Sequence, residues 1–114
     1  MKKIEAIVNP QRLDAVNSAL VAVGVRGITV TDVKGVGRAD GEPETPPLPP
    51  HLQGNNFISK VTIEVVLPDE LLPHALGAIQ SAAQSGHIGD GKVFVTTIEE
   101  VIRVRTGERG TLAL

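Results

Sequence analysis

The chain has 114 residues, with eleven lysine and arginine side chains against thirteen aspartate and glutamate side chains. This near balance excludes a broad electrostatic hold on nucleic acid, and Phe57 and Phe94 are too few aromatic residues for a base-stacking platform. The absence of cysteine excludes disulfides and thiolate metal sites. The length predicts a single domain, residues 1–114, that gains stability by oligomerising.

No stretch of the sequence has the composition of a leader or a membrane span. Residues Met1–Glu5 lead directly into an alternating pattern, and no apolar run approaches the length that crosses a bilayer. We therefore expect a cytoplasmic protein without membrane insertion.

The first half of the chain predicts two strands around a helix. Residues 3–8 alternate as in a strand, and Asn9-Pro10 is a helix-start signal, with Asn9 as the cap. Apolar residues then recur at helical spacing as far as Gly24, which predicts a helix at about 11–23. Residues 27–36 are rich in β-branched residues and predict the second strand.

A long interruption follows at residues 37–57, with five prolines between Pro43 and Pro50. A loop of this length inside a small domain is usually functional or disordered, so we expect a mobile arm that faces a partner. A disordered loop with no fixed partner is the alternative.

The second half repeats the order of elements. Residues 58–67 predict a third strand, and Asp69 caps a helix that ends before Gly86. A fourth strand is expected at 93–98, and residues 101–105 continue in extended form.

The order β-α-β-β-α-β predicts an α+β, ferredoxin-like fold with one antiparallel sheet and two helices on one face. The second sheet face would carry Ile7, Thr29 and Val65. Burying that face against a sister subunit would explain its apolar character, so the pattern favours a homo-oligomer.

The run Gly89-Asp90-Gly91-Lys92 has the chemistry of a phosphate-binding turn, because glycines let backbone N–H groups approach an anion and lysine supplies countercharge. A helix C-cap followed by a tight turn is the alternative. Arg103 and Arg105 are two residues apart on an extended segment, so both would lie on one face and could reach one polyphosphate. The alternative is a strand face that is simply exposed to solvent.

A second glycine and cation cluster, Gly35-Val36-Gly37-Arg38, stands at the mouth of the arm, with Lys60 on the far side. Grafted sites usually lie where strands leave a sheet. The spacing is not that of a Walker A motif.

Four segments closely resemble the P-II nitrogen-regulatory signalling proteins, and the resemblance covers nearly the whole chain outside residues 39–57. These segments are residues 1–7, 27–38, 88–95 and 102–108. The resemblance implies a homotrimer with ATP or ADP as regulatory ligands in three clefts between subunits. It makes the arm the T-loop (about 37–57), Gly89–Lys92 the B-loop, and Arg103–Glu108 the C-loop within a C-terminal loop of about 103–114.

The same resemblance assigns the nucleotide-binding residues position by position. Gly35, Gly37, Arg38 and Lys60 would lie near the phosphates, which Gly89, Asp90, Gly91, Lys92, Arg103 and Arg105 would hold. Thr29, Glu64 and Val66 would contact adenine or ribose, with Ile7 on the apolar wall.

Two departures from the family pattern lie in the arm. Ala39 stands where members that bind magnesium, ATP and 2-oxoglutarate together have a metal-ligating glutamine, which argues against magnesium and predicts weak or absent 2-oxoglutarate sensing. The chain also has no tyrosine, which excludes uridylylation on tyrosine. We expect the proline-rich tip to bind the partner. Its residues are Pro46, Pro47, Leu48, Pro49, Pro50 and His51.

The sequence thus predicts a non-enzymatic, nucleotide-binding signalling protein that regulates a transporter or an enzyme through its T-loop. The alternative is a related sensor of inorganic carbon or regulator of metal transport. Nucleotide hydrolysis with Asp90 or Glu64 as the base is a further alternative. His51, His74 and His87 are far apart in sequence, so we expect no metal site.

Overall fold

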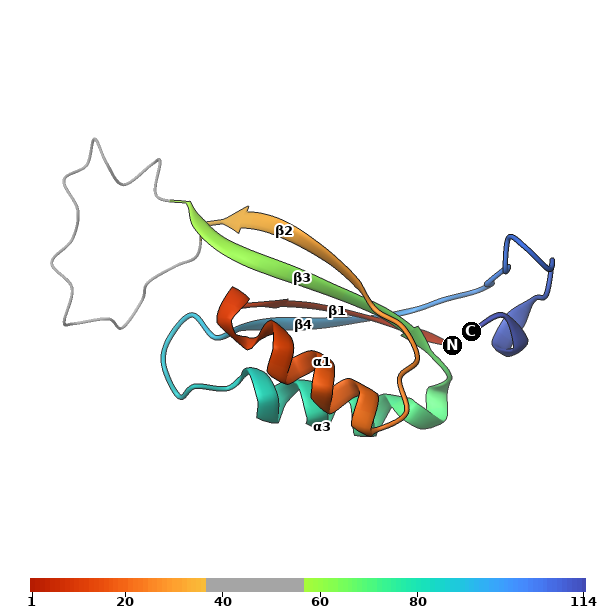
Figure 1. Cartoon of the computed structure of the whole chain (residues 1–114), viewed down its shortest axis with the longest axis horizontal. Helices are drawn as coiled ribbons and strands as arrows, with labels where there is room; N and C mark the ends of the chain where they lie inside the picture. The colour runs from red at the N-terminus through yellow and green to blue at the C-terminus, as the bar shows by residue number, and fades with distance from the viewer. Residues whose placement is uncertain (37–56) are drawn as a thin grey trace, which may run out of the picture.

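The computed structural model describes residues 1–36 and 57–114, which form one antiparallel sheet with two helices against one face (Figure 1). The predicted arm lies outside the described residues except for Phe57. The strands are β1 (Lys2–Val8), β2 (Thr29–Gly35), β3 (Ile58–Leu67) and β4 (Gly91–Thr97). The helices are α1 (Leu13–Ala22) and α3 (Leu72–Ala83), and short 3-10 turns span Pro10–Arg12, Asp69–Leu71 and Gly110–Ala113. The predicted ferredoxin-like fold is confirmed.

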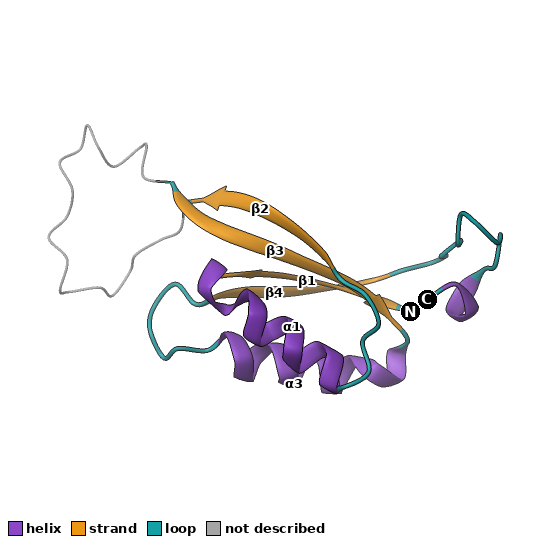
Figure 2. Ribbon diagram, in the orientation of Figure 1, coloured by secondary structure: helices purple, strands orange, loops and turns teal. Residues whose placement is uncertain are grey.

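The strand order is β2-β3-β1-β4, so β1 lies in the middle of the sheet and β2 and β4 form its edges (Figure 2). The register places Ile4 opposite Val65 on β3 and opposite Val95 on β4. Both helices cover the face that carries Ile4, which leaves the face that carries Ile7 open.

The core fills the layer between the sheet and the helices, because alternate residues of β1 and β3 point toward α1 and α3. Its fully buried side chains include Ile4, Val16, Leu20, Ile63 and Ile79. Val65 belongs to the same cluster and is only 4% exposed, so its predicted place on the second face is wrong. It faces the helices because it pairs with Ile4.

Both helix starts differ from the prediction in how their polar residues are used. Asn9 stands at the N-cap position with Pro10 after it, but its side chain makes no capping hydrogen bond within the described residues. The predicted cap at Asp69 is wrong, since Pro68 occupies that position and the Asp69 carboxylate pairs with the amino group of Met1 at 3.0 Å. That hydrogen bond and ion pair lower the pKa of Asp69.

The C-terminal segment turns where the sequence predicted extended chain. Residues 104–106 form a turn, closed by a hydrogen bond from Gly107 N to Arg103 O at 2.8 Å, and Ile102 bridges back to Arg109. Arg103 and Arg105 are therefore not neighbours on one face of an extended segment, as predicted. Among the described residues, no helix has the length and apolar character needed to cross a membrane.

Candidate functional site

Lys60 links three segments at one end of the open face. Its ammonium donates hydrogen bonds to the side-chain oxygen of Asn9, just after β1, and to the carbonyl oxygen of Gly89, just before β4. Of the predicted phosphate-binding residues, the structure thus brings Lys60 and the Gly89 turn into direct contact.

Lys92 joins this group from β4, because Ile7 lies opposite Lys92 on one side and Thr62 on the other. Side chains of directly opposite residues share a face. Ile7 and Lys92 therefore project from the open face, as Lys60 does two residues along β3 from Thr62.

Asp90 is committed to the shape of its own loop. Its carboxylate accepts hydrogen bonds from Ser85 N at 2.7 Å, from the Ser85 hydroxyl and from Gly86 N at 3.1 Å. These hydrogen bonds, from the Ser85 side chain first, lower the pKa of Asp90. An anionic carboxylate held in this way orders the turn and leaves only the backbone of Asp90 to face an anion.

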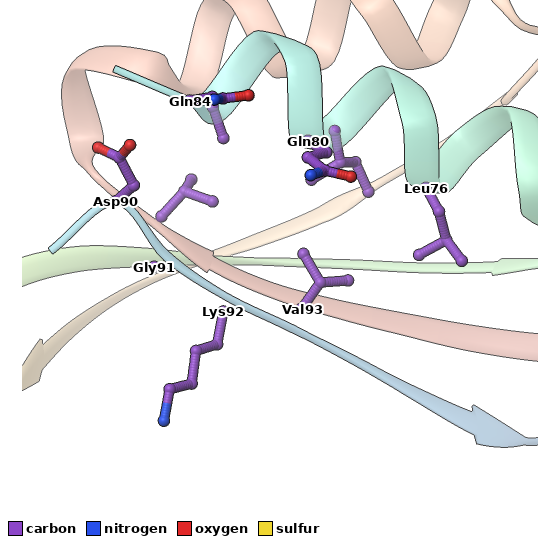
Figure 3. Close-up of a pocket in the computed structure, with 10 residues that line it drawn as sticks. Leu76, Gln80, Gln84, Asp90, Gly91, Lys92 and Val93 are labelled. Atoms are coloured by element: carbon purple, nitrogen blue, oxygen red, sulfur yellow. The ribbon is translucent and has the colours of Figure 1, made fainter. Parts of the chain in front are cut away.

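A cavity of about 400 Å³ lies beside this turn, but on the helix side of the sheet (Figure 3). Leu76 and Gln80 of α3, and Gln84 just after the helix, face Val93 of β4 across it. Lys92 is among the residues that line it, but the side chain of Lys92 points away from α3, so its ammonium lies outside this cavity.

The residues predicted to contact adenine or ribose gather at the other edge of the sheet. Thr29 pairs with Glu64, and both line a cavity of about 320 Å³ together with Val66 and Lys3. The Lys3 ammonium and the Glu64 carboxylate form an ion pair at 3.0 Å, and this hydrogen-bonded contact raises the pKa of Lys3. Glu64 is thus already paired in this structure.

In the C-terminal segment, Arg103 is held by its own neighbours. One nitrogen of its guanidinium lies 3.2 Å from Glu108 Oε1, and another donates to the main-chain oxygen of Leu114 at 3.1 Å. Thr106 also donates to Glu108, at 2.8 Å. Arg105 is exposed in the turn itself. An anion that bound the Arg103 guanidinium would have to displace the Glu108 carboxylate.

Several predicted site residues cannot be placed in this geometry. Gly35 ends β2 at the mouth of the arm, whereas Gly37, Arg38 and the predicted partner-binding residues 46–51 lie outside the described residues. Within residues 1–36 and 57–114, no cluster of three or more histidine or carboxylate side chains is suited to hold a metal ion.

Sequence reasoning missed three contacts around the site. Asn9 was interpreted as a helix cap, and neither Ser85 nor the pairing of Glu108 was singled out. Asn9 and Lys60 are 51 residues apart in sequence, so no local pattern could join them.

The fold and these contacts define a ferredoxin-like protein with cations gathered on an uncovered sheet face. The family model described as nitrogen regulatory protein P-II matches residues 1–108. The chain is 54% identical over 110 residues to a nitrogen regulatory protein P-II of Azospirillum brasilense, covering 96% of each chain. It is 52% identical over 114 residues to that of Bradyrhizobium diazoefficiens, covering 100% of each.

A solved structure, that of Arabidopsis thaliana PII bound to citrate, superposes with a TM-score of 0.81 at 40% identity, covering 99% of this chain and 91% of that one. The chain belongs to the nitrogen regulatory protein P-II family. Its relatives are named as regulatory proteins, and the resemblance found in the sequence is confirmed.

Proposed function

We propose that this chain is a non-enzymatic signalling protein that binds ATP or ADP in clefts between three identical subunits, and that it regulates a transporter or an enzyme through the T-loop. The observation that supports this most directly is the contact of the Lys60 ammonium with the Gly89 turn, on the sheet face that also carries Lys92. Two ammonium groups beside a glycine turn suit a polyphosphate.

The distribution of the two groups across the sheet supports a cleft between subunits. Thr29 lies on β2 and Lys92 on β4, at opposite edges and three strand spacings apart, or roughly 14 Å in the hydrogen-bonding direction. The cavity beside Thr29 and Glu64 includes none of the phosphate-facing residues. A second copy that brought its own edge alongside would let one nucleotide contact both groups.

The open face is also suited to burial against further copies. Phe94, which lies opposite Glu5 on this face, is 47% exposed. A further copy packed on this face would remove the ring from water.

A binding role, and not hydrolysis, is supported by the state of the two carboxylates that could serve as a base. Asp90 accepts three hydrogen bonds from Ser85 and Gly86, and Glu64 pairs with Lys3. A general base must reach the proton that it abstracts, and both carboxylates are otherwise engaged.

The route from nucleotide to T-loop runs through β3. Lys60 lies two residues inside the start of β3, directly after the loop. A ligand shifts a conformational equilibrium only through different contacts in the two states. Phosphate contacts at Lys60 would supply such a difference at the base of the loop.

Calorimetric titration with ATP, ADP and AMP, together with light scattering to measure the mass, tests the proposal. We expect a trimer that binds adenylates without multiple turnover and loses affinity in Lys92→Met. A monomer, or a protein that ignores adenylates at millimolar concentration, would refute it.

We further propose that 2-oxoglutarate sensing is weak and that magnesium is not held as a companion ion, because a methyl group at Ala39 cannot ligate a cation. Ala39 lies outside the described residues, so the proposal rests on side-chain chemistry alone. Titration of 2-oxoglutarate with magnesium and ATP present checks it, and micromolar binding would contradict it.

A further inference from the structure

We propose that Asn9 is a positioning residue for the phosphate-facing cation, in that its amide oxygen holds the Lys60 ammonium against the Gly89 turn without neutralising its charge. The inference rests on the proposed nucleotide function, which it extends to a residue not assigned to the site.

The geometry places Asn9 beside Lys60. Asn9 follows β1 directly, one residue beyond the antiparallel pair formed by Val8 and Val61, and Lys60 is the residue that precedes Val61 on β3. Asn9 Oδ1 accepts a hydrogen bond from Lys60 Nζ, and the same Nζ donates to Gly89 O. The two acceptors belong to different segments, one after β1 and one before β4, so together they fix the end of a long, flexible side chain.

The chemistry of the acceptors distinguishes Lys60 from two paired cations elsewhere in the chain. Lys3 and Arg103 each face a carboxylate, Glu64 and Glu108 respectively. Within the described part of the chain, both acceptors of Lys60 are uncharged carbonyl groups. An ammonium has three donors, so two neutral acceptors leave its third N–H and its full charge for an anion.

A purely local role for Asn9 fits the structure less well. Asparagine is favoured at helix N-caps because its side chain bonds a free backbone N–H, yet at Asn9 the described residues show no such bond. The first backbone bond there, from Arg12 N at 2.9 Å, goes to the Asn9 carbonyl and needs no side chain. Replacing the side chain should therefore leave the start of the helix intact.

Three variants separate positioning from capping. Asn9→Ala removes the acceptor, Asn9→Ser keeps a capping residue that is too short to reach Lys60, and Asn9→Asp keeps both shape and capping but adds a negative charge beside the ammonium. We expect each substitution to weaken the binding of ATP and of inorganic tripolyphosphate by about tenfold, the scale of one charge-assisted hydrogen bond. Asn9→Asp should have the lowest affinity of the three, because its carboxylate repels the polyanion.

Lys60→Met should lose affinity to a similar degree, whereas Lys34→Met, on the other face of the sheet, should not. The free energy of unfolding of the Asn9 variants should stay near that of the parent. The inference is overturned if Lys60→Met loses affinity while Asn9→Asp and Asn9→Ser bind both probes as the parent does. It is also overturned if Lys60→Met binds both probes with the affinity of the parent.

A measurement without ligand keeps the test separate from the proposed function. The side-chain amide resonances of Asn9 in NMR spectra should shift in Lys60→Met and stay in place in Lys34→Met. Failure of the parent protein to bind any adenylate would refute the proposed function, and unchanged Asn9 resonances in Lys60→Met would refute the positioning role.

Discussion

A side chain at Gly91 would collide with the strand beside it, since a Cβ atom there would lie 1.9 Å from the carbonyl oxygen of Ile7. Gly91 also has a φ angle of 115°, which L-residues with side chains rarely adopt. The close approach lies at the first residue of β4, where Gly91 pairs with Val8. The glycine is therefore required by the packing of β4 on β1, whatever the turn binds.

Gly91→Ala should lower the free energy of unfolding by at least about 2 kcal/mol, because it adds backbone strain to a steric clash. Gly89→Ala is the matched control: its φ is 94° but no atom lies within 4 Å of the added Cβ, so about 1 kcal/mol is expected. Urea denaturation of both variants measures the difference, and equal losses would contradict the steric explanation.

Leu20 and Val21 are neighbours on α1 with opposite environments: Leu20 is fully buried, whereas Val21 is 61% exposed. Leu20→Ala should cost about 2 to 5 kcal/mol of stability by leaving a cavity between α1 and the sheet. Val21→Ala should change it by less than about 0.5 kcal/mol. Thermal and urea unfolding measure the stability of both variants. Equal losses in Leu20→Ala and Val21→Ala would contradict the described core.

Asp90 should make stability depend on acid pH. Because its folded pKa is lowered, its contribution is present above the unfolded pKa of about 3.9 and is lost as the pH falls through the lower folded value. Asp90→Asn should therefore be less stable than the parent at neutral pH and should lose less stability on acidification. Urea unfolding between neutral and strongly acid pH measures this.

Asp32→Asn, at an exposed position on β2, serves as its control and should follow the parent curve. If the stability of Asp90→Asn changed with pH in parallel with that of the parent, the Ser85 contacts would contribute nothing to the pH dependence of stability.

Glu108 competes with any anion for Arg103. Glu108→Gln keeps the size of the side chain but removes its charge, so tripolyphosphate affinity should rise by up to about fivefold, as expected for an exposed ion pair. Glu100→Gln removes the carboxylate that lies 3.7 Å from Arg109 and should have less effect. An unchanged affinity in Glu108→Gln, measured by calorimetry at low salt, would exclude Arg103 from the phosphate site.

Mixed assemblies test whether two copies share each nucleotide. Glu64→Ala and Lys92→Met should each bind poorly alone. When the two variants are refolded together in equal amounts, about a quarter of the clefts should bind again if the two residues act from different copies. The copy that supplies Glu64 is intact in half of the clefts, and the copy that supplies Lys92 is independently intact in half. Binding that stays at the level of the single variants would place both residues in the same copy's site.

The sequence predicted the scaffold of this protein well because the scaffold depends on local patterns. Alternation placed the third strand at 58–67, where β3 lies, and Gly24 and Gly86 follow their helices with positive φ angles of 103° and 83°. Val65 was assigned to the wrong face because the period of a strand does not say which face the helices cover.

The site depended on contacts that no local pattern encodes. Asp69 was predicted to cap a helix, but Pro68 takes that position and the Asp69 carboxylate pairs with the amino group of Met1, 68 residues away in sequence. Arg103 and Arg105 were expected on one strand face, but the bridge from Ile102 to Arg109 folds that segment back on itself. Such pairings between segments decide which polar groups remain available for a ligand.

The placement of Thr29 and Lys92 at opposite edges of one sheet has a thermodynamic consequence. If one adenylate is held by both edges where two copies meet, as proposed above, it binds the assembly and not the separated chains. By mass action, adenylates would then hold the oligomer together on dilution, and the apparent affinity would fall with protein concentration below the point of dissociation.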